Sequence, residues 1–354
     1  FLCCQINNKM SQKPHLLMVF DQDSTFVRRD VRILSEDYEV VDYHFANKPK
    51  WKALLSLVHL FFYIVLNRKF KTVVTQSAGY LSFAPALLGK LGLLKCAIVV
   101  IGTDGAKLPE INYGHFVRQP LATFTSASLK MAQLILPVHK SLEQHDYVYD
   151  DVKFKQQGFR SFCGTIITPV QEVVNGYDYL KFEKTIEWKD RKRTFLTVAA
   201  QLNHVAFKRK GMDLIFQLAE LHPEHDFTVV SSLPSDILVP TNVQVLGNVP
   251  QDELVSFYNQ HKYYFQLSMF EGFPNALCEA MLCGCVPIGS MVAAIPEIIA
   301  EEGYVLERKD LDLLSALIQK ANGEEKNPRE QIKGNFPIER RSKELLHEIN
   351  QLHK

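Results

Sequence analysis

Short, continuous runs of apolar residues alternate along this chain with longer stretches in which apolar residues recur at helical spacing. Short apolar runs bounded by turn residues are typical of strands buried on both faces of a parallel sheet. In the first half, strands are predicted at His15–Phe20, Tyr38–Phe45, Thr72–Thr75, Ala97–Ile101 and Leu134–Val138. Helices are predicted between them, at Ser24–Leu34, Trp51–Asn67, Leu81–Leu91 and Phe116–Met131. This order of elements indicates a doubly wound α/β domain.

The same alternation restarts in the second half of the chain. Strands are predicted at Thr194–Val198, Phe227–Val230, Val243–Leu246, Tyr263–Leu267 and Val286–Ile288. Helices are predicted at Met212–Leu221, Glu253–Gln260, Ala276–Cys283 and Pro296–Glu301. Two successive units predict two doubly wound, Rossmann-like domains whose parallel sheets face a cleft. We place the first domain at residues 10–173 and the second at 174–335, with the turn cluster Val173–Asp178 at their junction.

Composition narrows the class of protein. Apolar residues make up 47% of the chain and charged residues 22%, as in ordinary globular proteins, and a net charge of +1 gives no general attraction to nucleic acid. The seven cysteines follow no disulfide-scaffold spacing, which fits a reducing compartment. The sequence has no Cys-x-x-Cys pair of the kind that would indicate a metal site. No segment reaches the roughly 18 apolar residues of a membrane-spanning helix. We expect a cytoplasmic protein whose natural start is Met10, with a tag or leader before it.

Two carboxylates eight positions apart flank a predicted helix start. Glu271 lies on the loop after the strand, Asn275 is the expected N-cap, and Glu279 follows near the end of the first turn. The free N–H groups of Ala276 and Leu277 and the positive end of the helix dipole then form an anion site. An exposed acid near a helix start is ordinarily explained by the dipole alone. A phosphate site between two hydroxyl-accepting carboxylates instead indicates a nucleotide joined to a sugar.

A basic cluster precedes another helix. Lys208-Arg-Lys210 could be a solvated charge run, but it stands directly before Gly211, at the end of the sheet where ligands of doubly wound folds bind. Lys210, with Arg209 less central, is expected to neutralise a diphosphate. In the first domain, Gly102-Thr103-Asp104 follows a predicted strand and so faces the same cleft, although Asp commonly caps a turn at such a place.

These motifs, taken in order, resemble the E-x7-E retaining GT-B glycosyltransferases of the family-4 group, also called glycosyl transferases group 1. The resemblance rests on the following segments: Lys208–Gly211, Val245–Val249, Glu271–Met281, Ala280–Ile288 and Ile295–Glu297. It implies a GT-B fold in which a C-terminal helix within residues 336–354 crosses back onto the first domain.

The resemblance also implies roles for individual residues. Glu279 would hold the ribose hydroxyls, Glu271 would contact the donor sugar, and Lys210 would pair with the diphosphate. Asp104 would touch the sugar or the acceptor as a third catalytic residue. The further substrate-binding residues are then Gly102, Thr103, Gln201, Arg209, Phe273, Pro274, Asn275, Ala276 and Leu277.

The implied function is transfer of a sugar, with retention, from a nucleotide-diphosphate sugar to a hydroxyl of a saccharide or lipid-linked acceptor. Neither a metal nor any cofactor beyond this co-substrate is expected, and cell-surface polysaccharide or glycolipid synthesis is the analogous role. The chain departs from the family pattern at Gln201, where an Arg is usual, at Ile101 in place of His, and at Ala293-Ala294 in place of two glycines; the loop from Asn203 to Phe207 is longer. A nucleotide-sugar epimerase of the same fold and a non-catalytic partner subunit remain as alternatives.

The predicted helix from Trp51 to Leu66 is apolar nearly all round, and lysines and an arginine bracket it. A helix that covers a parallel sheet is the common arrangement, so burial in the first domain is expected. The alternative is contact with a membrane interface, which would place the protein peripherally on the inner face of the membrane.

Overall fold

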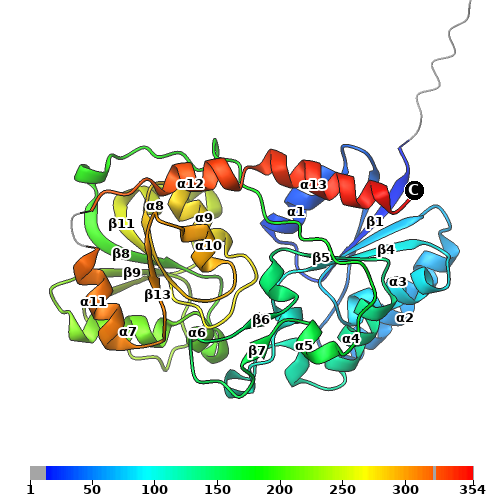
Figure 1. Cartoon of the computed structure of the whole chain (residues 1–354), viewed down its shortest axis with the longest axis horizontal. Helices are drawn as coiled ribbons and strands as arrows, with labels where there is room; N and C mark the ends of the chain where they lie inside the picture. The colour runs from blue at the N-terminus through cyan, green and yellow to red at the C-terminus, as the bar shows by residue number, and fades with distance from the viewer. Residues whose placement is uncertain (1–12, 322–323, 354) are drawn as a thin grey trace, which may run out of the picture.

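The computed structural model describes residues 13–321 and 324–353, so the expectation about Met10 lies outside the described residues. Two lobes lie side by side, each built on its own sheet (Figure 1). The first sheet has the order β2-β1-β3-β4-β5, and all its strands are parallel. Its strands are β1 (His15–Phe20), β2 (Glu39–His44), β3 (Thr72–Gln76), β4 (Lys95–Val100) and β5 (Leu134–Pro137). The helices between them are α1 (Thr25–Leu34), α2 (Lys50–Leu66), α3 (Tyr80–Lys90) and α4 (Leu121–Met131).

The second sheet has the order β10-β9-β8-β11-β12-β13 and is also parallel throughout. Its strands are β8 (Lys192–Val198), β9 (Phe227–Val230), β10 (Val243–Leu246), β11 (His261–Gln266), β12 (Val286–Ser290) and β13 (Tyr304–Leu306). Its helices are α6 (His204–Arg209), α7 (Met212–Leu221), α8 (Gln251–Gln260), α9 (Asn275–Leu282), α10 (Ile295–Ile299) and α11 (Leu311–Lys320). The predicted pair of doubly wound α/β units is confirmed.

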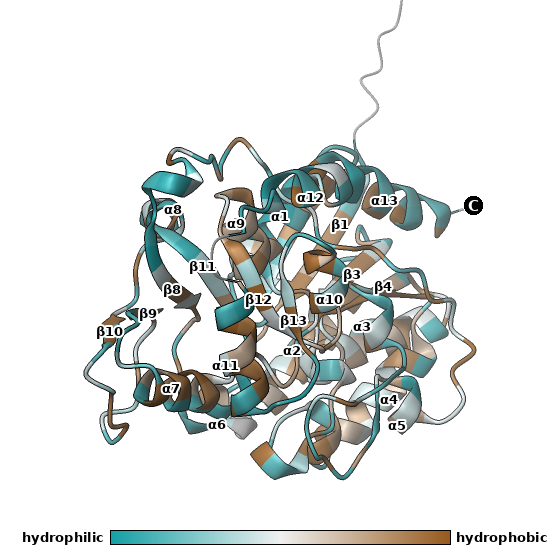
Figure 2. Cartoon of the chain, turned by 60° about the vertical axis from the view of Figure 1, so that its left-hand side comes forward, coloured by the Kyte–Doolittle hydropathy of each residue, from teal (hydrophilic) through white to brown (hydrophobic). Residues whose placement is uncertain are grey.

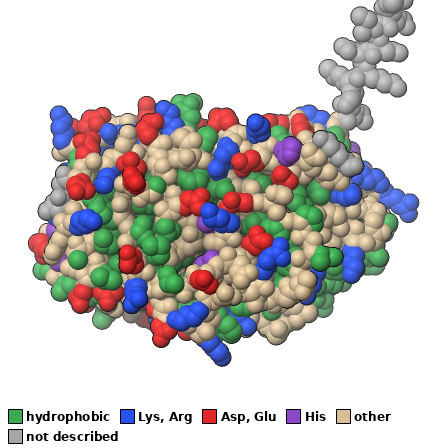
Figure 3. All heavy atoms as spheres, in the orientation of Figure 1, with side chains coloured by type: hydrophobic (Ala, Val, Ile, Leu, Met, Phe, Trp, Pro, Cys, Tyr) green, Lys and Arg blue, Asp and Glu red, His purple; other side chains and the backbone are tan. Residues whose placement is uncertain are grey.

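Smaller elements connect these units. They are the strands β6 (His145–Asp146) and β7 (Gln156–Gln157), the helix α5 (Arg160–Cys163), and the 3-10 helices η1 (Thr103–Gly105), η2 (Pro109–Ile111), η3 (His115–Val117), η4 (Lys140–Leu142) and η5 (Trp188–Asp190). Buried hydrophobic side chains form the core of both lobes. In Figure 2, helices such as α7 and α11 carry both brown, hydrophobic residues and teal, hydrophilic ones. Acidic and basic side chains are interspersed over the face shown in Figure 3, in line with the net charge of +1.

The last two helices, α12 (Pro328–Asn335) and α13 (Ile338–Gln351), lead the chain back from the second lobe onto the first (Figure 1). The expected crossing is confirmed. On the first lobe, the guanidinium of Arg341 donates two hydrogen bonds to the carboxylate of Asp30 at 2.8 and 2.7 Å, and both side chains are buried. The same guanidinium donates to the carbonyl of Val173, at the junction between the lobes.

Two expectations about local structure were wrong. The stretch from Asn203 to Phe207 is not a long loop, because Asn203 caps helix α6 by accepting a hydrogen bond from the amide of Ala206 at 2.8 Å. The expected burial of α2 was also wrong. Only Ala53, Leu60 and Ile64 of this helix are buried, while these large apolar side chains are exposed: Trp51, Leu54, Leu55, Val58, Phe62, Val65 and Leu66. None of the described helices is long and apolar enough to cross a membrane.

Candidate donor site between the two lobes

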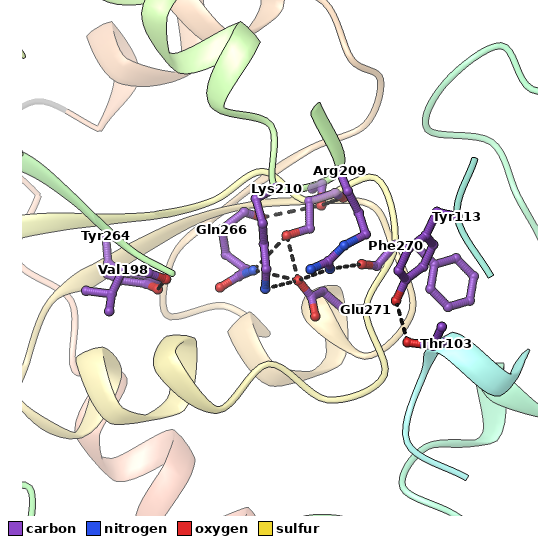
Figure 4. Close-up of polar contacts among 11 residues, drawn as sticks. Thr103, Tyr113, Val198, Arg209, Lys210, Tyr264, Gln266, Phe270 and Glu271 are labelled. Carbon is purple, nitrogen blue, oxygen red and sulfur yellow. Dashed lines mark hydrogen bonds and ion pairs between the residues drawn. The ribbon is translucent and has the colours of Figure 1, made fainter. Parts of the chain in front are cut away.

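The carboxyl ends of the strands of both sheets point toward the boundary between the lobes, and Glu271 lies there, just beyond β11 (Figure 4). Its Oε1 atom accepts hydrogen bonds from Lys210 Nζ at 2.5 Å and Ser268 Oγ at 2.8 Å. Arg209 and Gln266 approach the same oxygen at 3.4 Å. No described residue donates to Oε2, so this oxygen is left to accept a hydroxyl of a ligand.

The charges around Glu271 decide its protonation. Burial by itself favours the neutral acid, but the charges of Lys210 and Arg209 outweigh burial and lower the pKa of Glu271. Burial also lowers the pKa of Lys210, although Glu271 opposes this shift. The site therefore holds a carboxylate beside two cations. Gly211 makes this geometry possible: its φ is +73°, and a Cβ there would lie 2.1 Å from the carbonyl oxygen of Leu267.

Glu279 lies on α9 and is almost fully buried. Its carboxylate accepts hydrogen bonds from Gln251 Nε2 at 3.1 Å and from the hydroxyl of Tyr258 at 3.3 Å. Burial raises its pKa, and among the described residues no cation lies within ion-pair distance of it. Glu279 is thus held by neutral donors, and its carboxylate keeps lone pairs for further hydrogen bonds.

The start of α9 differs from the prediction. Asn275 is the first helical residue and not the N-cap, which is Pro274, and no side chain caps the helix. Its Oδ1 instead accepts hydrogen bonds from the hydroxyl of Tyr177 at 2.7 Å and from Asn175 at 3.3 Å, both in the junction between the lobes. The amides of Ala276 and Leu277 belong to the first turn and lack acceptors within the helix. The predicted anion site at this turn therefore has its donors, without a side-chain cap.

Phe273 and Pro274 were expected to line the substrate site, but both are buried. The ring of Phe273 stacks near Tyr177, with centroids 6.3 Å apart, and meets Phe336 edge-on at 5.3 Å. The side chain of Leu277 is also buried in the core. These residues shape the loop that carries Glu271, and of Leu277 only the backbone is placed to meet a ligand.

The Gly102-Thr103-Asp104 turn touches the second lobe. A Cβ on Gly272 would lie 2.0 Å from the carbonyl oxygen of Ile101, and one on Gly102 would lie 3.2 Å from the amide of Gly272. The expected contact between Asp104 and a sugar is contradicted by its surroundings. The carboxylate is fully buried, and its four hydrogen bonds come from the amides of Ile101, Gly102 and Ala78 and the hydroxyl of Ser77. Asp104 fixes the turn instead.

Tyr113 is a site residue that sequence reasoning missed. It comes from the first lobe, yet the guanidinium of Arg209 lies over its ring, 4.9 Å from the centroid (Figure 4). Its hydroxyl lies 3.1 Å from Thr103 Oγ1, and burial raises its pKa, so the phenol is neutral. No pattern of periodicity around Tyr113 marks it, because its partner is almost a hundred positions away.

Gln201 is exposed, and the structure does not bring it to Glu271; Arg209 takes a place beside that carboxylate. Ala293, which stands where the family usually has glycine, adopts a φ of +48°, in the left-handed region that favours glycine. The cysteines Cys278, Cys283 and Cys285 are buried, and burial raises the pKa of each thiol. Within the described ranges, one group has the spacing of metal ligands: His222, Glu224 and His225. It lies between α7 and β9, at the amino end of a strand, whereas Glu271 lies beyond the carboxyl end of β11.

Comparison with known proteins gives a consistent picture. Residues 204–336 match the family described as glycosyl transferases group 1. A 76-residue segment, 22% of this chain and 20% of the relative, is 34% identical to the O-antigen chain mannosyltransferase B of Escherichia coli. A 126-residue segment, 32% of this chain and 28% of the relative, is 27% identical to a subunit of the phosphatidylinositol N-acetylglucosaminyltransferase of Arabidopsis thaliana.

Solved structures match the fold over almost the whole chain. The sucrose-phosphate synthase of Thermosynechococcus elongatus is 12% identical with a TM-score of 0.73, and the alignment covers 96% of this chain and 99% of that one. The HepE protein of Anabaena, solved in complex with UDP and glucose, is 10% identical with a TM-score of 0.65 over 95% of this chain and 99% of that one. The two facing parallel sheets show a GT-B fold, and within it residues 204–336 are similar to the glycosyl transferases group 1 family.

Proposed function

We propose that this chain is a retaining glycosyltransferase that moves a sugar from a nucleotide-diphosphate sugar to an acceptor hydroxyl. The observation that carries the proposal is the placement of two carboxylates around the first turn of α9, the buried Glu279 and the partly buried Glu271, with Lys210 and Arg209 beside Glu271. The names of the relatives support it, since the two proteins above are a mannosyltransferase and an N-acetylglucosaminyltransferase subunit, and HepE was solved with UDP and glucose.

In the proposed reaction, the donor binds mainly to the second lobe. Glu279 accepts the ribose hydroxyls, and the Oε2 atom of Glu271 accepts a hydroxyl of the sugar. The Lys210 ammonium donates one of its three N–H groups to Glu271, which leaves two N–H groups for phosphate oxygens. Together with Arg209 and the first amides of α9, Lys210 stabilises the negative charge of the departing diphosphate.

The acceptor proton needs a base on the face from which the sugar leaves. Asp104 does not serve, because its two oxygens already accept four hydrogen bonds, from Ser77 and Ala78 after β3 and from Ile101 and Gly102 in its own turn. The departing diphosphate takes the proton on that same face, which gives retention of configuration. We expect the transfer to need no divalent metal, because the protein's own cations neutralise the leaving group.

Two alternatives make different predictions. A non-catalytic partner subunit would have no reason to keep Glu271, Glu279 and Lys210 in this arrangement. A nucleotide-sugar epimerase would need the same donor site but no acceptor. If purified protein converts a nucleotide sugar to its epimer with no acceptor present, the epimerase is correct and the transferase is wrong.

Thermal unfolding with UDP, GDP and ADP, each added singly, tests the donor site. A ligand at 100 times its Kd adds about 2.7 kcal/mol of stability, so the midpoint should rise by several degrees with one nucleotide. Glu279→Ala should lose this shift, and Glu301→Ala, an exposed glutamate outside the site, should keep it. Nucleotide binding that is unchanged in Glu279→Ala would refute the assignment of the ribose site.

We also propose that the exposed face of α2 docks on an anionic membrane. Docking would place the protein on the cytoplasmic side of the inner membrane. It fits a lipid-linked acceptor and a role in the synthesis of cell-surface polysaccharide or glycolipid. The face carries Trp51, Leu54, Leu55, Phe62 and Leu66, all more than half exposed. Four exposed cations flank it: Lys52, Arg68, Lys69 and Lys71. Apolar side chains enter the acyl boundary while cations near the surface add about 1 kcal/mol each on an anionic leaflet.

Co-sedimentation with vesicles tests this docking. Protein should bind vesicles that contain phosphatidylglycerol and bind less to pure phosphatidylcholine. Because burying a leucine side chain contributes about 1.5–3 kcal/mol, Leu55→Glu should weaken binding at least about tenfold. Leu238→Glu changes a leucine that is 92% exposed in the second lobe and should have no effect. Equal losses in both variants would argue against docking through α2.

A further inference from the structure

A second cavity lies in the first lobe, apart from the donor site. It measures about 650 Å³ and opens between α4 and the segment of residues 154–163. Its walls combine the following groups: the ammonium groups of Lys107 and Lys130, the hydroxyls of Thr123, Ser126 and Ser161, and the rings of Phe116, Phe154 and Phe162. No aspartate or glutamate is among the described residues that line it. The cavity is therefore positive and partly aromatic. Two of its hydroxyls already donate within the protein, Thr123 to Gln119 Oε1 at 2.9 Å and Ser161 to the carbonyl of Gln157 at 3.2 Å.

The walls of this cavity are held in place by a buried amide. The side chain of Gln157 is fully buried, and its Oε1 accepts a hydrogen bond from the amide of Lys107 at 2.8 Å. Its Nε2 donates to the carbonyl of Lys107 at 3.0 Å and to that of Phe154 at 2.9 Å. The side chain of Gln157 thus holds the backbones of Lys107 and Phe154 at a fixed distance from each other.

The ammonium group of Lys107 is preorganised. It lies 4.2 Å from the ring centroid of Phe154 and 5.3 Å from that of Phe162, so both rings restrict it. Within the part of the chain that the structure describes, no carboxylate forms an ion pair with Lys107 or Lys130. On α4, Thr123 and Ser126 are three positions apart and so share a helix face. Cations and hydroxyl donors of this kind match the oxygens of a phosphate or carboxylate, and the rings match the apolar face of a sugar.

The cavity is also tied to the boundary between the lobes. Lys107 follows Asp104 by three residues, a span of at most about 10 Å, and Asp104 fixes the turn that touches the second lobe. The amide of Gly158, next to Gln157, donates to the carbonyl of Gly105 in the same turn at 2.9 Å. The wall of the cavity and the turn that touches the second lobe are therefore joined by a direct hydrogen bond.

We propose that this cavity binds a saccharide that carries a phosphate or carboxylate group, as the anionic part of the acceptor. The proposal rests on the proposed transferase function for its role, but the binding itself can be measured separately. Lys107, Lys130 and the hydroxyl of Ser126 hold the anion, and Phe154 with Phe162 contacts the sugar ring.

Isothermal titration of the full chain with glucose 6-phosphate, glucuronate, glucose and inorganic phosphate tests the proposal. Glucose 6-phosphate or glucuronate should bind at least about tenfold more tightly than glucose, because a charge-assisted hydrogen bond adds about 1.5–3 kcal/mol, and the preferred probe tells phosphate from carboxylate. The double variant Lys107→Met, Lys130→Gln should lose this preference, and Ser126→Glu, which adds a carboxylate to the cavity, should lose it as well. Lys153→Gln is the matched control: Lys153 also lies over Phe154, at 5.7 Å, but does not line the cavity.

Each result decides one point. Equal binding of glucose and the anionic sugars, or a double variant that binds them unchanged, would overturn the cavity as an anion site. Inorganic phosphate bound as tightly as glucose 6-phosphate would overturn the role of the rings. The nucleotide-induced rise in the unfolding midpoint, measured on the same variants, shows whether they fold. If it persists while no anionic sugar binds, this inference fails alone; if anionic sugars bind but no nucleotide does, the proposed donor site fails and the cavity stands.

Discussion

The position of Arg209 is set by single residues from both lobes. Its Nη1 donates to the carbonyl of Phe270 at 3.2 Å, and its guanidinium covers the ring of Tyr113 from the other lobe. Gln201, which stands where the family usually has Arg, is neutral, so Arg209 supplies the second cation beside Glu271, and Tyr113 keeps it there. We therefore infer that Tyr113 is a positioning residue for the proposed reaction.

Tyr113→Leu should lower kcat and leave the fold intact. Loss of the ring removes about 0.5–2 kcal/mol of cation–π interaction, which corresponds to a fall in kcat of about 2- to 30-fold. Tyr113→Phe keeps the ring and should stay close to wild type. Steady-state kinetics with the nucleotide sugar would measure both variants. A Phe variant as slow as the Leu variant would show that the hydroxyl on Thr103, and not the ring, matters.

Asp104→Asn should destabilise the protein, because its carboxylate is a structural acceptor. The amide keeps one acceptor oxygen, so donors now bound to the other oxygen lose their partner. An unsatisfied buried donor costs about 1–3 kcal/mol, which urea unfolding would detect as a lower midpoint. The nucleotide-induced rise in the thermal midpoint should persist in this variant. A variant with wild-type stability but no transfer would restore the catalytic role first expected for Asp104.

At the scale of elements, α13 is fastened to α1 by one buried ion pair. Asp30 receives both hydrogen bonds from Arg341 and a third from Gln76 Nε2 at 2.6 Å. The amphipathic pattern of residues 338–351 predicts a surface helix, but the pair that fixes it joins residues more than 300 positions apart. This contact carries the C-terminal end of the chain onto the first lobe.

Arg341→Met should lower the free energy of unfolding by about 3–5 kcal/mol, because it leaves the Asp30 charge buried and unpaired. Adding Asp30→Leu should recover part of that loss, since the second change removes the unpaired charge. Chemical denaturation of the two variants and the wild type would give the values. If the double variant is less stable than Arg341→Met alone, Asp30 is held by its other partners and the pair is not the main fastening.

At the scale of the whole molecule, buried imidazoles couple stability to pH. Burial lowers the pKa of His115, His139, His145 and His261 from the ordinary value of 6.5. Below pH 6.5 the unfolded chain takes up protons at these residues while the folded chain does not, so unfolding is favoured as pH falls. Glu279 acts in the opposite direction, because its raised pKa lets the folded protein bind a proton first.

We expect the urea midpoint to fall steadily between pH 7 and pH 5. His261→Asn should make this fall shallower, since it removes one group whose Nδ1 and Nε2 contact the carbonyl of Phe257 and the hydroxyl of Thr228. His347→Asn, an exposed histidine on α13, should leave the slope unchanged. A midpoint that does not vary over this range would mean that the imidazoles are protonated in the folded protein.

The sequence by itself determined the two doubly wound sheets and much of the donor site. Strand-and-helix alternation is a local pattern. Glu271 after β11, Lys210 before α7 and Glu279 in the first turns of α9 all belong to the second lobe, so their approximate place in the candidate donor site could be predicted. Tertiary structure decided the rest. Four features depend on which distant segments of the chain pack together. They are the contact of Tyr113 with Arg209, the four donors around Asp104, the junction residues that bind Asn275, and the exposed face of α2. Periodicity tells which faces of an element are apolar, but only packing decides whether another element covers them.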